Sequence, residues 1–66
     1  MDIGQLLYRP EEGASVLGVS RSRLFELLAA GEVESVQIGR SRRIPREALV
    51  AYVDRLRADQ GGGVAA

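Results

Sequence analysis

The chain has 66 residues, of which 45% are hydrophobic and 27% charged, and nine basic residues balance nine acidic ones to a formal net charge of zero. A chain this short forms one small domain, because it buries only about 60% of the surface that its unfolded form exposes. The absence of Cys and His excludes disulfides, thiolate or imidazole metal sites and Ser-His-Asp hydrolysis. We therefore predict no enzyme, metal or cofactor. Zero net charge, taken alone, argues against nucleic-acid binding, because such domains are commonly basic.

The two ends of the chain carry no targeting or membrane pattern. The N-terminal residues lack a positive cluster followed by a long apolar run, and no segment reaches the roughly 18 apolar residues of a membrane span. We expect a cytoplasmic protein with no membrane partner and no small-molecule substrate. Residues 1–5 are predicted to form an N-terminal arm, 6–58 the folded domain and 59–66 a disordered tail, since consecutive glycines are flexible.

A first helix is predicted over residues 10–17. Pro10 suits the first helical position, and the carboxylates of Glu11 and Glu12 favour the positive end of the helix dipole. Gly18 supplies the positive φ that ends many helices. Because Gly13 costs about 1 kcal/mol relative to alanine inside a helix, we expect this helix to be frayed or shortened.

A second helix is predicted over residues 21–30, after a short turn that contains Gly18. Ser20 is a good N-cap, and Leu24, Leu27 and Leu28 recur at i, i+3 and i+4, which places them on one face. Two short helices separated by a glycine-containing turn of three residues are typical of a helix-turn-helix, whose second helix enters the major groove of DNA.

The second half of the chain predicts a hairpin and a closing helix. Apolar β-branched residues around an arginine-rich turn indicate strands at about 35–38 and 42–45. A third helix over 46–58 carries Leu49, Val53 and Leu56 at i, i+4 and i+7, and we expect it to close the core. The predicted fold is therefore mainly α with a small β-hairpin, a winged helix-turn-helix.

The arginines are concentrated in the middle of the chain, so a net charge of zero does not exclude nucleic-acid binding. Residues 21–46 hold six arginines against three glutamates: Arg21, Arg23, Arg40, Arg42, Arg43 and Arg46 against Glu26, Glu32 and Glu34. If the second helix and the hairpin lie side by side, these arginines form one patch that can neutralise phosphates along a duplex. The alternative is an ordinary solvated face, but like charges at a hairpin tip contribute nothing to folding.

The N-terminal part of the second helix holds the leading candidates for base contact, Arg21, Ser22 and Arg23. Each arginine can either bind guanine through two hydrogen bonds or hold a phosphate. Phe25 faces away from the leucine stripe and is expected either to pack against the hairpin or to lie against sugar-phosphate. Glu26 can accept from a cytosine amine or pair with an arginine.

Three segments, residues 17–25, 36–40 and 43–49, resemble the excisionase family of small helix-turn-helix proteins, which is related to MerR-type regulators. The resemblance covers about residues 6–56 and implies a recognition helix in the major groove and a wing against the minor groove or backbone. With Phe25, the implied DNA-binding residues are Arg21, Ser22, Arg23, Glu26, Gly39, Arg40, Ser41, Arg42 and Arg43. The chain departs from the family where Arg9 replaces a capping Ser or Thr, Arg42 an aromatic residue and Glu26 a basic or polar one.

The resemblance also implies a role. Excisionases direct integrase-mediated recombination toward excision by binding and bending DNA near an attachment site, often cooperatively, so the implied partners are double-stranded DNA, a cognate integrase and further copies of the chain. Two alternatives stay open from the residues alone. One is a small MerR-like transcriptional regulator that binds promoter repeats, and the other is a protein-interaction module, which the neutral charge favours.

Overall fold

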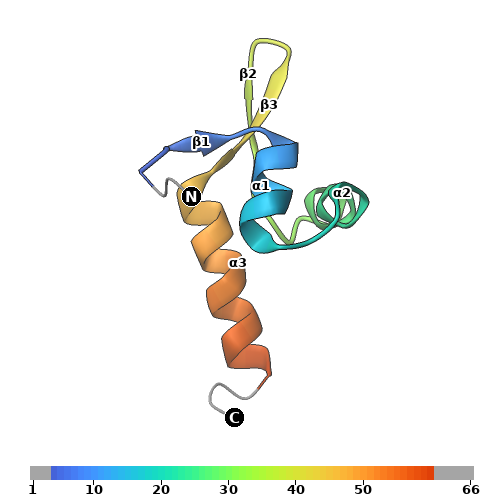
Figure 1. The fold of residues 1–66 in the computed structure, drawn as a ribbon, viewed down its shortest axis with the longest axis vertical. Helices are drawn as coiled ribbons and strands as arrows, with labels where there is room; N and C mark the ends of the chain where they lie inside the picture. Colours follow the sequence, from blue (N-terminus) through green and yellow to red (C-terminus); the bar gives the residue numbers. More distant parts are fainter. Residues whose placement is uncertain (1–3, 61–66) are drawn as a thin grey trace.

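The computed structural model describes residues 4–60, and it shows three helices around a small antiparallel sheet. The elements in chain order are β1 (Leu7–Tyr8), α1 (Pro10–Leu17), α2 (Arg21–Ala29), β2 (Val36–Ile38), β3 (Ser41–Pro45) and α3 (Arg46–Asp59). In Figure 1 the β2–β3 hairpin projects from one end of the molecule and α3 from the other, with α1 and α2 beside their junction. This is the predicted winged helix-turn-helix. The expected arm and tail fall mostly on residues 1–3 and 61–66, outside the described residues.

The sheet contains a strand that the sequence did not predict. β1 pairs with β3 in antiparallel register, with Leu7 opposite Pro45 and Tyr8 opposite Ile44. The backbone N–H of Arg46 also donates to the carbonyl of Leu6 at 2.9 Å. The strand order is therefore β1-β3-β2, and the sheet has three strands instead of the expected two. Two residues are too few to show the alternation by which strands are found in a sequence.

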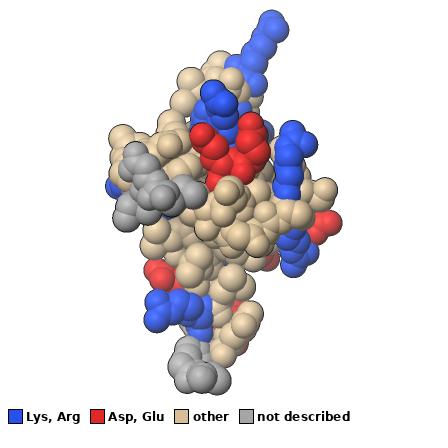
Figure 2. Space-filling model, viewed as in Figure 1, with Lys and Arg blue, Asp and Glu red and all other residues tan. Residues whose placement is uncertain are grey.

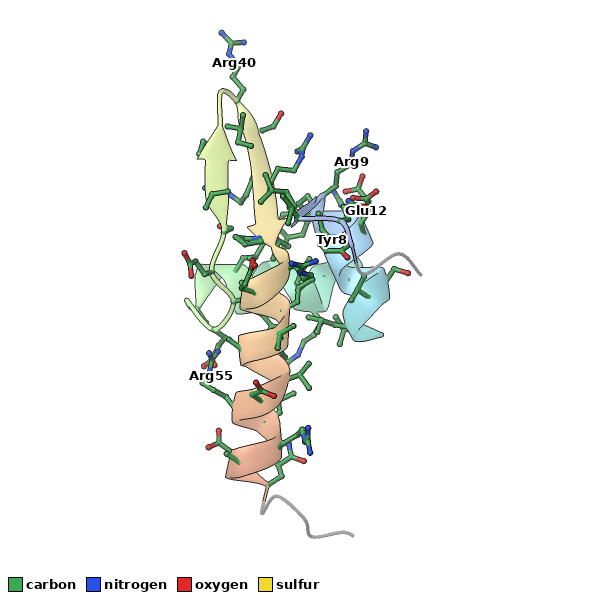
Figure 3. The ribbon with its side chains drawn as sticks, turned by 90° about the vertical axis from the view of Figure 1, so that its left-hand side faces the viewer. Tyr8, Arg9, Glu12, Arg40 and Arg55 are labelled. Atoms are coloured by element: carbon green, nitrogen blue, oxygen red, sulfur yellow. The ribbon has the colours of Figure 1, made fainter. Side chains whose placement is uncertain are left out.

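The N-terminus of α1 is held by Glu12. An arginine side chain has no hydrogen-bond acceptor, so Arg9 at the N-cap position cannot cap the helix in the usual way. Instead, the Glu12 carboxylate accepts the backbone N–H of Arg9 at 2.9 Å and the side-chain amide of Gln5 at 3.1 Å. Figure 3 shows Arg9 and Glu12 together at this end of the helix. The helix runs over the full predicted length to Leu17, so the expectation of a frayed or shortened helix is wrong.

The same contacts lower the pKa of Glu12 below its ordinary value of 4.5. The backbone N–H of Arg9 is the largest cause, followed by the Gln5 amide; burial opposes them by raising the pKa, and the charges of Arg9 and Arg43 lower it by less than any of these. A carboxyl with a lowered pKa stabilises the fold above its unfolded-state pKa, and that contribution is lost as the pH falls through the folded-state pKa.

We therefore expect Glu12→Gln to reduce stability at neutral pH, because glutamine can still accept from Arg9 but carries no charge. The difference from the wild type should shrink as the pH falls below 4.5 and the native carboxyl becomes protonated. Urea unfolding at a series of pH values measures this difference. Glu11→Gln is the matched control, since Glu11 shares the helix dipole but does not accept the Arg9 N–H. An equal, pH-dependent loss in both variants would assign the effect to the dipole alone.

Gly13 lets α1 approach the sheet closely. A Cβ at this buried position would lie 2.9 Å from Ile44 Cδ1 and 3.7 Å from Leu24 Cδ2. Contacts below 3.0 Å require a shift, and Ile44 and Leu24 are both completely buried. The glycine that looked like a defect of the helix is therefore a packing requirement of the helix–sheet contact.

Gly13→Ala is expected to show no net stabilisation, because the gain of about 1 kcal/mol in helix propensity is offset by overpacking of about 1–3 kcal/mol. Ile44→Val removes the Cδ1 atom and costs about 0.5–1.5 kcal/mol alone. In the Gly13→Ala background it should cost less, because it also relieves the contact. A double-mutant cycle measured by urea unfolding tests this coupling, and strictly additive free energies would contradict it.

The core lies where α1 and α2 meet β3, and α3 contributes residues of its first turns only. Leu24, Val33 and Ile44 are the most deeply buried side chains, and Leu49 of α3 joins them. Val53 and Leu56, however, are 40% and 37% exposed, so the expectation that they close the core is wrong. Figure 1 shows the reason, since the C-terminal half of α3 extends beyond the rest of the fold.

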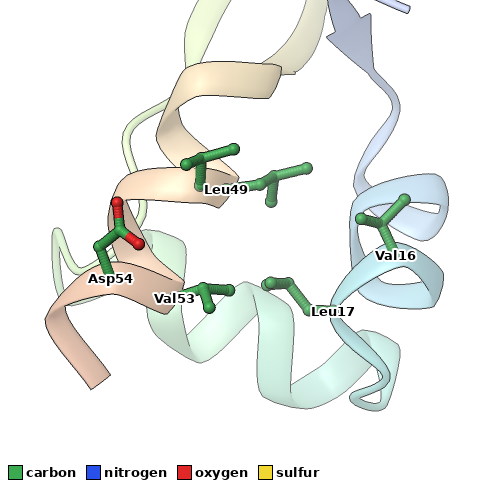
Figure 4. Close-up of a pocket in the computed structure, with 6 residues that line it drawn as sticks. Val16, Leu17, Leu49, Val53 and Asp54 are labelled. Carbon is green, nitrogen blue, oxygen red and sulfur yellow. The ribbon is translucent and has the colours of Figure 1, made fainter. Parts of the chain in front are cut away.

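An apolar groove lies between α1 and α3. Its volume is about 270 Å³, and it is lined by Val16, Leu17, Leu49, Val50, Val53 and Asp54. Figure 4 shows the two helices facing each other across this space. Val16 and Leu17 are partly buried against the core from the α1 side. Val53 lines this groove and does not enter the core, so its side chain stays partly exposed although it has the apolar spacing of a core residue.

Candidate nucleic-acid interface

The turn between α1 and α2 fixes the angle at which α2 is presented. Gly18 has a φ of 76° and ends α1, and the N–H of Val19 donates to the carbonyl of Ala14 at 3.0 Å. Ser20 then caps α2, because its Oγ accepts the backbone N–H of Arg23 at 3.1 Å. The predicted cap and helix start are confirmed, and α2 ends at Ala29.

The described surface of α2 has two edges with different charges. Successive residues of a helix are rotated by about 100°, so Arg21 and Phe25 share one edge while Arg23 falls on the other. Phe25 lines a hollow together with Leu28, Ala29 and Arg42. Because Arg42 belongs to β3, we call this side of α2 the wing edge. Arg23 lines a second hollow, which also includes Tyr52 and Leu56 of α3. We call this side of α2 the α3 edge.

The wing edge carries a cation–aromatic pair. The Arg21 guanidinium carbon lies 4.9 Å from the centre of the Phe25 ring. Phe25 lines the hollow between α2 and the hairpin, and its side chain remains 39% exposed. Such a contact is worth about 0.5–1 kcal/mol at an exposed site, and it restrains the orientation of the arginine.

The α3 edge carries pairs of opposite charge. Arg23 Nη1 lies 2.9 Å from Glu26 Oε1, which is one of the two roles expected for Glu26. Arg55 of α3, labelled in Figure 3, lies 3.8 Å from the Glu32 carboxylate and also donates to the Glu32 carbonyl. Each of these two arginines is thus accompanied by a glutamate. The α3 edge therefore carries less net positive charge than its arginines alone would give.

The wing is a tight hairpin with a two-residue turn. Ile38 pairs with Ser41, and Gly39 adopts a φ of 60°, which the primed turns of such hairpins require. β3 begins at Ser41, one residue earlier than predicted, and it contains Arg42 and Arg43, as the predicted strand over 42–45 did. Arg40 occupies the tip and points away from the protein (Figure 3).

The two strand arginines face opposite sides of the hairpin, because side chains alternate along a strand. Arg42 lies on the α2 side, where its Nη1 donates to Ser35 Oγ at 2.6 Å. Arg43 lies near Glu12, whose pKa its charge lowers. Ser35 could not be identified from the sequence, since its contact with Arg42 spans seven residues and exists only once the hairpin forms.

The predicted site residues therefore do not form a single patch. The structure brings Arg21, Phe25 and Arg42 together at the wing edge and places Arg23 and Glu26 on the α3 edge. Ser22 is exposed on α2 between these edges, and Gly39 and Ser41 flank Arg40 at the end of the hairpin. Figure 2 shows a face on which basic side chains are separated by neutral ones and, at the base of the hairpin, lie beside acidic ones.

Residues 4–60 contain no cluster of three or more Asp and Glu side chains arranged to hold a metal ion. Within the same residues, no helix has the length and apolar character needed to span a membrane.

Comparison with known proteins agrees with this geometry. Residues 7–57, which include all three helices up to Arg57, match the family described as helix-turn-helix domain. The chain belongs to this family. The helix-turn-helix chain is also 50% identical over 56 residues to a protein of Saccharopolyspora erythraea named "Probable excisionase". The match covers 85% of the chain and 57% of that relative, so the chain spans a little over half of the relative's length. No solved structure matches it significantly.

Proposed function

We propose that this helix-turn-helix chain is an excisionase, which binds and bends DNA near an attachment site and directs an integrase toward excision. The observation that carries the proposal is the 50% identity to a probable excisionase across most of the chain, with the helix-turn-helix and the wing both inside the matched region. In this role the chain acts as a DNA-binding protein and not as an enzyme, in the cytoplasm of a bacterium that carries the element.

The geometry supports a contact centred on the wing edge. Residues 6–58 act as the DNA-binding domain, with the N-terminal part of α2 in the major groove and the hairpin against the neighbouring backbone. Arg21, Ser22 and Phe25 make the groove contacts, and Arg40, Ser41 and Arg42 of the wing make the backbone contacts, with Gly39 shaping the turn. Arg23, Glu26 and Arg43 lie at the periphery of this contact.

The neutral total charge supports binding in several copies. A chain with nine basic and nine acidic residues has weak sequence-independent attraction for DNA, so a single domain gains little affinity from charge alone. Bending a short site by 40–90° costs on the order of 1–6 kcal/mol, and contacts made by several copies on adjacent sites offset it. We therefore propose that copies of the chain bind side by side, together with a cognate integrase.

An excision assay tests the proposal. The substrate is a plasmid that carries the two attachment sites of the element encoding the chain, and the recombinase is the integrase of the same element. We expect the purified chain to retard an attachment-site duplex at low micromolar concentration or below, and to increase excision product. A double variant, Arg40→Ala with Arg42→Ala, should bind the duplex more weakly and give less excision product while remaining folded.

The outcomes separate the candidate roles. Duplex binding without any effect on excision would contradict the excisionase role and favour a transcriptional regulator that binds promoter repeats. Absence of binding to both attachment-site and promoter duplexes would contradict DNA recognition itself.

A further inference from the structure

We propose that Arg21 and Phe25 act as one base-reading unit, in which Arg21 binds a guanine and Phe25 contacts the methyl group of a thymine in the adjacent base pair. This inference rests on the proposed DNA-binding function and specifies the sequence feature that it recognises. It also assigns base reading to Arg21 in preference to Arg23, a choice that the sequence left open.

Arg21 and Arg23 differ in the groups that their guanidinium ions contact. Arg23 Nη1 already donates to Glu26 Oε1 at 2.9 Å, and the accompanying carboxylate would repel an approaching phosphate and compete with a guanine. Arg21 lies instead against the Phe25 ring, with 4.9 Å between the guanidinium carbon and the ring centre. A cation–aromatic contact uses the charge of the guanidinium and leaves its N–H donors for acceptors.

The position of Arg21 in α2 also favours base contact. Arg21 is the first residue of α2, and the N-terminal residues of a recognition helix are those that reach base edges. Guanine presents two acceptors in the major groove, O6 and N7, which match the paired donors of an arginine. A restrained guanidinium at this end of the helix loses less rotamer freedom on binding than a free one.

The exposed ring of Phe25 suits an apolar contact in the same groove. Phe25 is 39% exposed, although it is one of only three aromatic residues in the chain. The thymine methyl is the apolar group that the major groove offers to such a side chain. Because Arg21 and Phe25 touch each other, their targets must lie on neighbouring base pairs, which are about 3.4 Å apart. The expected target is therefore a guanine next to a thymine.

The test begins with selection of binding sites by the full chain from a pool of randomised duplexes. We expect the selected sites to share a guanine adjacent to a thymine. Two modified duplexes then each remove one chemical group from this step. Deoxyuridine in place of thymine removes only the methyl, and 7-deazaguanine in place of guanine removes only the N7 acceptor.

For the wild type, we expect about fourfold weaker binding with deoxyuridine, the effect of one lost apolar group, and roughly tenfold or greater loss with 7-deazaguanine. Phe25→Ala should bind the thymine and deoxyuridine duplexes equally. Arg21→Ala should be insensitive to 7-deazaguanine. Arg23→Ala is the matched control and should keep both sensitivities. Circular dichroism confirms the fold of each variant, with Phe25→Leu as a second variant for the ring position.

Different results would contradict the proposed function and the Arg21–Phe25 unit. If the wild type selects no site at all, the proposed function is contradicted. If it selects a site that lacks the guanine–thymine step, or if Phe25→Ala retains the sensitivity to deoxyuridine, sequence-specific binding stands and the Arg21–Phe25 unit is overturned. If Arg23→Ala, and not Arg21→Ala, loses the response to 7-deazaguanine, base reading belongs to the α3 edge.

Discussion

Leu24→Ala is expected to leave most of the protein unfolded at 25 °C. Leu24 is completely buried where α2 meets α1 and β3, and truncation of such a leucine costs about 2–5 kcal/mol. A domain of fewer than 70–80 residues rarely gains more than about 3–5 kcal/mol of stability from its core. The loss is therefore comparable to the whole stability. Urea unfolding followed by circular dichroism at 222 nm should show no native baseline.

Val53→Ala is the matched control for this prediction. Val53 continues the apolar spacing of α3 but is 40% exposed beside the groove, so we expect it to cost about 1 kcal/mol or less. A loss as large as that of Leu24→Ala would mean that α3 closes onto α1 in solution. Retention of a wild-type transition by Leu24→Ala would remove α2 from the core.

The contrast between Leu24 and Val53 shows which parts of the fold could be predicted from the sequence. The helix start at Pro10, the N-cap Ser20, the helix-ending Gly18 and the hairpin were predicted from local chemistry, because caps and turns depend on a few adjacent residues. The exposure of Val53 was not predicted, because periodicity identifies the apolar face of a helix but not where its neighbours end. β1 and the role of Gly13 likewise depend on contacts with β3, more than 30 residues away in the chain.

The same limit applies to the candidate site. The sequence identified the arginines, the recognition helix and the wing, and the structure sorts them by edge and by strand face. That sorting depends on one-residue details. Arg42 and Arg43 are adjacent in β3, so their side chains lie on opposite faces of the hairpin, and Arg40 alone of the three is at its tip. The pairing of Arg23 with Glu26 and of Arg21 with Phe25 then gives two arginines of one helix different roles.

We expect the wing arginines to contribute unequally to the salt dependence of DNA binding, because they lie on different parts of the hairpin. Each phosphate contact contributes about 0.9 to the slope of log affinity against log salt, so about four contacts give a slope of roughly −3 to −4. Arg40 is at the tip and Arg42 faces α2, and replacing both with alanine should reduce the slope to about −2. Between 50 and 200 mM salt the wild type should then lose on the order of 100-fold in affinity, and the double variant only about 10-fold.

Arg43→Ala is the matched control, since the same residue type in the same strand faces Glu12 instead of α2. We expect its slope to stay close to that of the wild type. Titration of a fluorescent attachment-site duplex at four or more salt concentrations gives all three slopes. A slope reduced as much by Arg43→Ala as by Arg42→Ala would place the duplex across both faces of the hairpin. An unchanged slope in the Arg40 and Arg42 double variant would remove the wing from the interface and leave α2 as the element that binds the backbone.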